Sequence, residues 1–150
     1  AIKNAAMSIS MPYVDGRWIG GTLTNAGQIR KRVEKMEKLT SEREKGELAK
    51  YTKKERLLID REITNLERFF SGIVSMKDLP KALFVVDPKN EKNAVKEARD
   101  MGITVIALAG SDCNLKEVTH PIVGNDASQT SIQFFVNEIT KAYSEGKSVV

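Results

Sequence analysis

The chain has 150 residues, of which 41% are hydrophobic and 29% are charged, and this is the composition of one globular domain with a core of its own. No run approaches the roughly 20 apolar residues of a membrane-spanning helix, and the first ten residues lack the layout of a secretory signal, so we expect no membrane partner. The single cysteine, Cys113, excludes an internal disulfide and favours a reducing compartment such as the cytoplasm.

The net charge of +4 is concentrated in one segment of the chain. Between Arg30 and Arg68 the sequence holds 13 Lys and Arg residues against 9 Asp and Glu residues, whereas the remainder holds 11 of each. We therefore expect a basic arm attached to an electrically neutral body.

The first 25 residues predict the end of a helix, a short strand and a loop. Residues 1–10 have apolar side chains at helical spacing, and Met11–Val14 is an apolar run whose proline stands where a strand loses no hydrogen-bond donor. The loop that follows holds the only tryptophan, Trp18, next to Arg17 and shortly before two adjacent glycines. This combination favours a tight turn anchored by an aromatic ring.

The charged segment predicts an antiparallel helical hairpin over residues 26–71. The first helix extends to about Ser41, Gly46 interrupts the pattern, and Thr52 with Glu55 has the spacing of a capping box that starts the second helix. The apolar side chains recur at spacings of three and four residues: Ile29, Val33, Met36 and Leu39, then Ile59, Ile63, Leu66 and Phe70. Because these seams are narrow, we expect an arm inserted into an α/β body made of residues 1–25 and 72–150.

The second half of the chain alternates strands and helices. Apolar runs at residues 82–87, 103–108 and 121–123 predict strands, the first two buried on both faces. A helix between the first two buries Ala94, Val95, Ala98 and Met101 and ends at Gly102, and a last helix with Ile132, Phe135, Val136, Ile139 and Tyr143 frays after Ser144. This order predicts a parallel sheet with helices on both faces.

Three aspartates, Asp87, Asp112 and Asp126, follow the predicted strands, where ligand sites of open α/β sheets occur. Carboxylates there could hold Mg²⁺ for a phosphoryl-transfer enzyme or a receiver domain, but aspartate is also common in turns, and no phosphate-binding glycine loop is present. Cys113 and His120 are too few for a zinc site, and as a nucleophile pair they are less favoured than as loop and strand-edge residues.

The candidate RNA-binding residues lie in the loop and the arm: Arg17, Trp18, Arg30, Lys31, Lys35, Lys38, Lys50, Lys53 and Lys54. Their positive charges suit RNA phosphates. The alternatives are a tryptophan that only packs on the core, a solvated face of interleaved charges, and a hairpin that pairs with helices of another protein.

These motifs resemble those of the bacterial-type small-subunit ribosomal protein S2 family from residue 1 to residue 143. The matching runs are Met11-Pro12-Tyr13-Val14, Arg17-Trp18-Ile19-Gly20-Gly21-Thr22-Leu23-Thr24-Asn25, Lys53-Lys54-Glu55, Leu66-Glu67-Arg68, Gly72-Ile73, Leu79-Pro80-Lys81-Ala82-Leu83-Phe84-Val85-Val86-Asp87, Glu97-Ala98, Gly102-Ile103 and Gly124-Asn125-Asp126. The first and last runs are specific to the family, whereas the middle strand alone is not.

The resemblance implies a flavodoxin-like parallel sheet with an inserted antiparallel helical hairpin, a coiled-coil arm. It implies a structural constituent of the small ribosomal subunit, without enzymatic activity or cofactor, that binds ribosomal RNA and supports translation. The expected partners are small-subunit ribosomal RNA, neighbouring ribosomal proteins and ribosomal protein S1, on a cytoplasmic or an organellar ribosome. Members of the family also have an N-terminal region with a basic helical segment and the central strand of the sheet, and neither occurs in this sequence.

Overall fold

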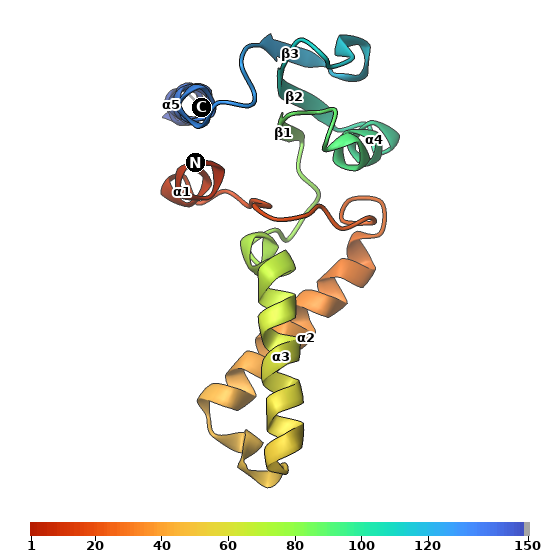
Figure 1. The fold of residues 1–150 in the computed structure, drawn as a ribbon, viewed down its shortest axis with the longest axis vertical. Coiled ribbons are helices and arrows are strands. Elements are labelled where there is room, and N and C mark those ends of the chain that lie inside the picture. The colour runs from red at the N-terminus through yellow and green to blue at the C-terminus, as the bar shows by residue number, and fades with distance from the viewer. Residues whose placement is uncertain (149–150) are drawn as a thin grey trace.

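The computed structural model describes residues 1–148 of the chain. In chain order the elements are α1 (Ile2–Ser8), α2 (Ala26–Glu44), α3 (Lys53–Phe70), β1 (Ala82–Val86), α4 (Lys92–Asp100), β2 (Thr104–Ala109), β3 (His120–Val123) and α5 (Gln129–Ser148), with short 3-10 turns at Glu47–Lys50, Ser71–Ile73 and Leu115–Glu117. Figure 1 shows a small sheet with its helices and a long arm, made of α2 and α3, that projects from it. The fold is α/β, as the alternation of elements predicts.

The described sheet has three parallel strands in the order β1-β2-β3. Phe84 lies opposite Ile106, which in turn lies opposite His120, so strands consecutive in the sequence are neighbours. β2 is the middle strand and the most deeply buried, with Val105 and Ala107 fully enclosed. Figure 1 shows α4 on one side of the strands and α5, packed beside α1, on the other, which confirms the prediction of helices on both faces.

β1 is less buried than its apolar sequence predicts. Only Val85 is buried in this strand, while Ala82 is exposed and the remaining residues are half-buried. The prediction of burial on both faces is wrong for β1, because the strand lies at an edge of the described sheet, where one row of backbone groups and part of the side-chain surface stay open.

The arm follows the predicted apolar seams. Its apolar cluster consists of Ile29, Val33, Met36, Leu66, Phe70 and Ile73. The capping box is confirmed: the Glu55 N–H donates to Thr52 Oγ1 at 3.4 Å, and the Thr52 N–H donates to the Glu55 carboxylate at 2.8 Å. α2 continues past the predicted end near Ser41, and Gly46, with a φ of +72°, turns the chain toward the second helix.

Residues 11–14 are irregular, so the prediction of a strand there is wrong. The N–H of Tyr13 donates to the carbonyl of Gly72 at 2.9 Å, and the described sheet ends at β1. The N–H of Met11 donates to the carbonyl of Ala6 at 2.9 Å, so the segment is hydrogen-bonded both to α1 and to the base of the arm.

Two helix ends also differ from the predictions. Met101 is 41% exposed because α4 ends at Asp100 and the chain turns at Gly102, whose φ is +68°. Glu97, and not Met101, is buried in this helix together with Ala94, Val95 and Ala98. The predicted fraying after Ser144 is also wrong, since α5 continues to Ser148. Over residues 1–148, no helix combines the length and the apolar character needed to cross a membrane.

Candidate nucleic-acid interface

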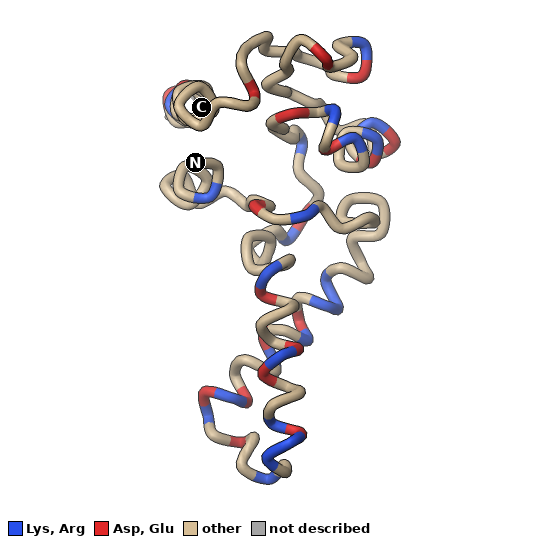
Figure 2. The backbone as a smooth tube through the Cα atoms, in the orientation of Figure 1, with Lys and Arg blue, Asp and Glu red and all other residues tan. Residues whose placement is uncertain are grey.

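The far end of the arm carries a basic surface, here called the arm tip, formed by Lys50, Tyr51, Lys53 and Lys54. All four side chains are exposed, and the ammonium of Lys50 lies 5.3 Å from the centre of the Tyr51 ring. In Figure 2 the lower end of the arm shows this gathering of Lys and Arg. None of the ion pairs found within residues 1–148 involves a lysine of the arm tip.

Glu55, the acidic residue nearest to the arm tip in the sequence, is hydrogen-bonded to the N-cap residue of α3. The Glu55 carboxylate accepts hydrogen bonds from the backbone N–H and the hydroxyl of Thr52, both at 2.8 Å. The backbone hydrogen bond from Thr52, followed by the one from its hydroxyl, lowers the pKa of Glu55. The capping box therefore holds this negative charge against the first turn of α3, where the helix dipole favours it.

Three of the four predicted basic residues on the flank of the arm, Arg30, Lys35 and Lys38, have partners within the molecule. Lys35 pairs with Glu62 across the two helices, and Lys38 Nζ lies 3.9 Å from the carboxylate of Glu42. Arg30 donates to the backbone carbonyls of residues 76 and 77 at the base of the arm, while Lys31 is exposed. Exposed ion pairs of this kind contribute at most about 1 kcal/mol, so Lys35 and Lys38 can exchange their partners for a phosphate at small cost.

The loop residues Arg17 and Trp18 lie in different surroundings. Arg17 is exposed. Trp18 is half-buried against the apolar cluster on the sheet side that includes Leu23 and Val95, and its indole N–H donates to Glu97 Oε1 at 3.2 Å. The structure thus places Trp18 as an anchor between the loop and α4, in agreement with the simpler of the two interpretations of this residue.

Glu97 is a residue of this region to which the sequence patterns assigned no role, although Glu97-Ala98 is one of the runs that carry the resemblance. Its carboxylate is bonded to the loop by the backbone N–H groups of Gly21 at 2.8 Å, Leu23 at 3.0 Å and Thr24 at 3.3 Å. Burial opposes its ionisation, but the hydrogen bonds from Leu23, Gly21 and Trp18 outweigh burial, so the pKa of Glu97 is lowered. The available signal was a glutamate on the apolar face of a predicted helix, next to Ala94 and Ala98.

Acid is expected to loosen this loop. A carboxyl whose pKa is lower in the folded chain stabilises the fold above its ordinary pKa, and that contribution is lost as the pH falls through the lowered value. Trp18 is the only tryptophan, so its fluorescence reports the change directly. We expect its emission to change at a pH below the usual range of a glutamate, and the Glu97→Gln chain to lack this step. The same titration curve in both chains would contradict the assignment.

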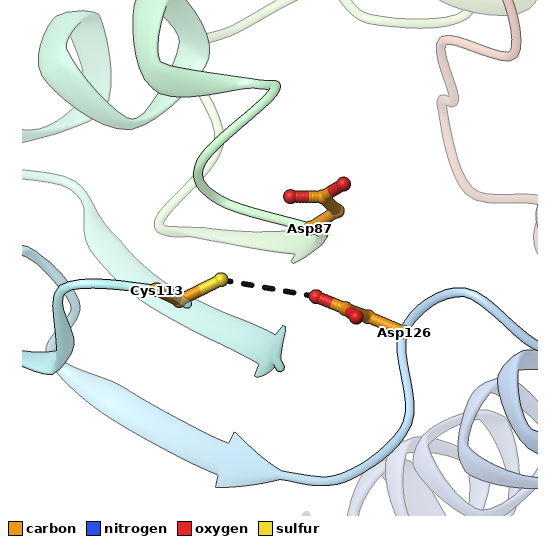
Figure 3. A group of neighbouring side chains, drawn as sticks. All are labelled: Asp87, Cys113 and Asp126. Atoms are coloured by element: carbon orange, nitrogen blue, oxygen red, sulfur yellow. Dashed lines mark hydrogen bonds between the residues drawn. The ribbon is translucent and has the colours of Figure 1, made fainter. Parts of the chain in front are cut away.

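The carboxyl ends of the strands bring together two of the three predicted aspartates. Asp87 and Asp126 lie beside Cys113, with their ligand atoms within 4.8 Å of one another (Figure 3). Asp112 is not part of this group. Its carboxylate accepts a hydrogen bond from Lys89 at 2.6 Å, and that bond lowers the pKa of Asp112. His120 lies on β3, exposed, and is not one of the three grouped side chains.

The grouped aspartates already serve the local backbone. Asp126 Oδ2 accepts the Gly110 N–H at 2.8 Å and, more weakly, the Cys113 thiol at 3.7 Å. Asp87 Oδ1 accepts the Asn90 N–H at 3.1 Å, which closes the turn after β1. The turn-forming role of aspartate therefore accounts for the local hydrogen bonds of both carboxylates.

The geometry defines an α/β protein with a parallel sheet and a long helical arm that carries an exposed basic tip. The family model described as Ribosomal protein S2 matches residues 1–146. The chain is 44% identical over 149 residues to small ribosomal subunit protein uS2 of Sulfurimonas denitrificans and 46% identical over 149 residues to that of Aliarcobacter butzleri. Each comparison covers 99% of this chain, and 58% and 56% of the two relatives.

The chain belongs to the ribosomal protein S2 family, which confirms the family indicated by the motifs. It spans somewhat more than half the length of the curated relatives that it matches.

Proposed function

We propose that this chain is a structural constituent of the small ribosomal subunit that binds ribosomal RNA and supports translation in the cytoplasm. The observation that carries the proposal is the arm tip, where Lys50, Lys53 and Lys54 are exposed and take no part in an ion pair of the described chain. Free ammonium groups that project far from the body can reach the phosphates of a large folded RNA. Proteins that recognise the shape of an RNA bind these phosphates. Membership of the ribosomal protein S2 family supports the same function.

The remaining residues predicted from the sequence differ in how freely they could bind RNA. Lys31 and Arg17 are exposed and available to phosphates, whereas Lys35 and Lys38 first have to leave their glutamates. We further propose that neighbouring ribosomal proteins, ribosomal protein S1 among them, contact the body of the protein. We assign no catalysis to the chain, since the carboxylates at the strand ends accept hydrogen bonds from backbone N–H groups of the neighbouring loops.

Reversing two charges of the arm tip tests the proposal. The double variant Lys53→Glu with Lys54→Glu is expected to reduce the fraction of the protein that sediments with small subunits, and to lower the salt dependence of binding by about two lost phosphate contacts. The matched control, Lys141→Glu with Lys147→Glu, makes the same change in net charge on the exposed end of α5. Equal sedimentation of the tip variant and the wild type would remove the arm tip from the RNA contacts.

One observation favours a second function, in which the arm pairs with a helix of another protein. Leu57 and Leu58, on α3 close to the arm tip, are 51% and 53% exposed. Apolar helix pairing depends little on salt, whereas RNA binding weakens steeply as salt rises. Binding that is insensitive to salt and is lost on Leu57→Ser with Leu58→Ser would favour this second function.

A further inference from the structure

We propose that Glu97 is a positioning residue that fixes the direction of the arm relative to the sheet, so that arm and body meet their partner as one rigid unit. The inference rests on the proposed RNA-binding function and adds how the arm is aimed. Glu97 itself is only 9% exposed and is placed at no contact surface.

The shape of the loop before α2 depends on the Glu97 carboxylate. Glu97 accepts from three backbone N–H groups of residues 21–24, from the Thr24 hydroxyl at 3.4 Å and from the Trp18 indole. A buried N–H without an acceptor costs about 1–3 kcal/mol, so the loop keeps this shape only while the acceptor is present. Acceptor and donors are 73 to 79 residues apart in the sequence, so the contact joins two separate parts of the fold.

The loop connects directly to α2, so its shape fixes the position of the first turn of that helix. Thr24, the last residue bonded to Glu97, is followed by Asn25, the N-cap of α2, and the Asn25 N–H donates to the Gly21 carbonyl at 2.8 Å. Leu23 is 2% exposed in the apolar cluster that Val95 of α4 also joins. Only Asn25 therefore lies between the last residue bonded to the carboxylate and the first residue of the arm.

Hydrogen bonds hold both helices of the arm at their base. Arg30 of α2 donates to the carbonyls of residues 76 and 77, which lead from the arm back to β1. Gly72, just after α3, accepts from Tyr13, in the segment that leads to the loop. Figure 1 shows the arm joined to the sheet part by these two connections, the loop before α2 and the segment before β1. Any change in the loop therefore turns the whole arm.

The length of the arm makes a small turn matter. At 1.5 Å per residue, the 19 residues of α2 span about 28 Å. A rotation of about 10° at the base therefore displaces the arm tip by about 5 Å, which exceeds the roughly 4 Å reach of an ion pair. A correctly aimed arm thus requires a fixed base.

The test measures arm direction and binding in the same set of variants. In the full chain with Cys113→Ser, nitroxide labels at Ala49→Cys near the arm tip and Lys116→Cys beside the sheet report the distance between the two parts by pulsed electron resonance. Glu97→Gln is expected to broaden this distance distribution, with far-UV circular dichroism unchanged, and to weaken small-subunit binding about tenfold, because binding must then order the arm. The matched control is Glu91→Gln, since Glu91 is the N-cap residue of the same helix, and the bonds from the loop go to Glu97.

A milder variant keeps the proposal testable if Glu97→Gln fails to fold. Trp18→Phe removes the indole hydrogen bond and part of the ring packing but leaves the backbone hydrogen bonds to Glu97, and it is expected to broaden the distribution to a smaller extent. An unchanged distribution in the folded variants, or a broadened one with unchanged binding, would overturn the positioning role. If instead the charge reversal at Lys53 and Lys54 leaves binding intact, the arm tip is not an RNA contact, whatever the distances show.

Discussion

Replacing Gly72 by alanine is expected to destabilise the base of the arm by about 3 kcal/mol, the upper end of what overpacking costs. A Cβ on Gly72 would lie 2.2 Å from the carbonyl oxygen of Tyr13 and 2.8 Å from its ring. One of the two clashing atoms belongs to the backbone and cannot rotate away. The same two residues share the hydrogen bond from the Tyr13 N–H to the Gly72 carbonyl, so relief of the clash also breaks this bond.

Urea unfolding followed by far-UV circular dichroism measures this loss, and Gly27→Ala is the control. Gly27 lies in α2 with no heavy atom within 4 Å of the position of an added Cβ, so alanine there is expected to stabilise the helix by up to about 1 kcal/mol. If the two glycine variants unfold at the same urea concentration, the close approach of Tyr13 and Gly72 does not exist in solution.

Replacing Ile63 by alanine is expected to cost about 3 kcal/mol through a cavity between the helices of the arm. Ile63 is 0% exposed and is the first of the three buried side chains of α3, and the narrow seam offers few side chains that could refill the space. Leu57→Ala on the same helix is the control, because this side chain is 51% exposed and its loss should stay within about 0.5 kcal/mol.

Thermal and urea unfolding of the two arm variants, monitored at a helix-sensitive wavelength, decide the point. Equal effects of Ile63→Ala and Leu57→Ala would mean that α2 and α3 are not packed together as the structure has them. A large loss for Ile63→Ala alone supports the arm as a packed hairpin.

The sequence predicts the features of this fold that depend on neighbouring residues. The capping box of Thr52 and Glu55 is a local motif, and the seam of Ile63, Leu66 and Phe70 follows from helical spacing, so both are found where the pattern indicates. The apolar runs of β1 and β2 likewise place the strands to within a residue.

Contacts between distant parts of the chain were not predictable in this way. Met11–Val14 has a strand-like composition, but Tyr13 bonds to Gly72, a partner that no local pattern indicates. The role of Glu97 depends on a loop more than 70 residues away, and Asp112 pairs with Lys89 instead of joining Asp87 and Asp126. The same is true of the candidate interface. The sequence shows where the lysines are, but only the structure shows which glutamates form ion pairs with Lys35 and Lys38.

The open edge of β1 has a consequence for handling the protein. Residues 82–86 form an apolar strand with one row of backbone donors and acceptors unpaired within the described sheet. Such an edge is a template for strands of other molecules, and a single lysine before the strand, Lys81, is a weak barrier against them. Preparations of residues 1–150 should therefore self-associate as their concentration rises, through backbone pairing that added salt does not suppress.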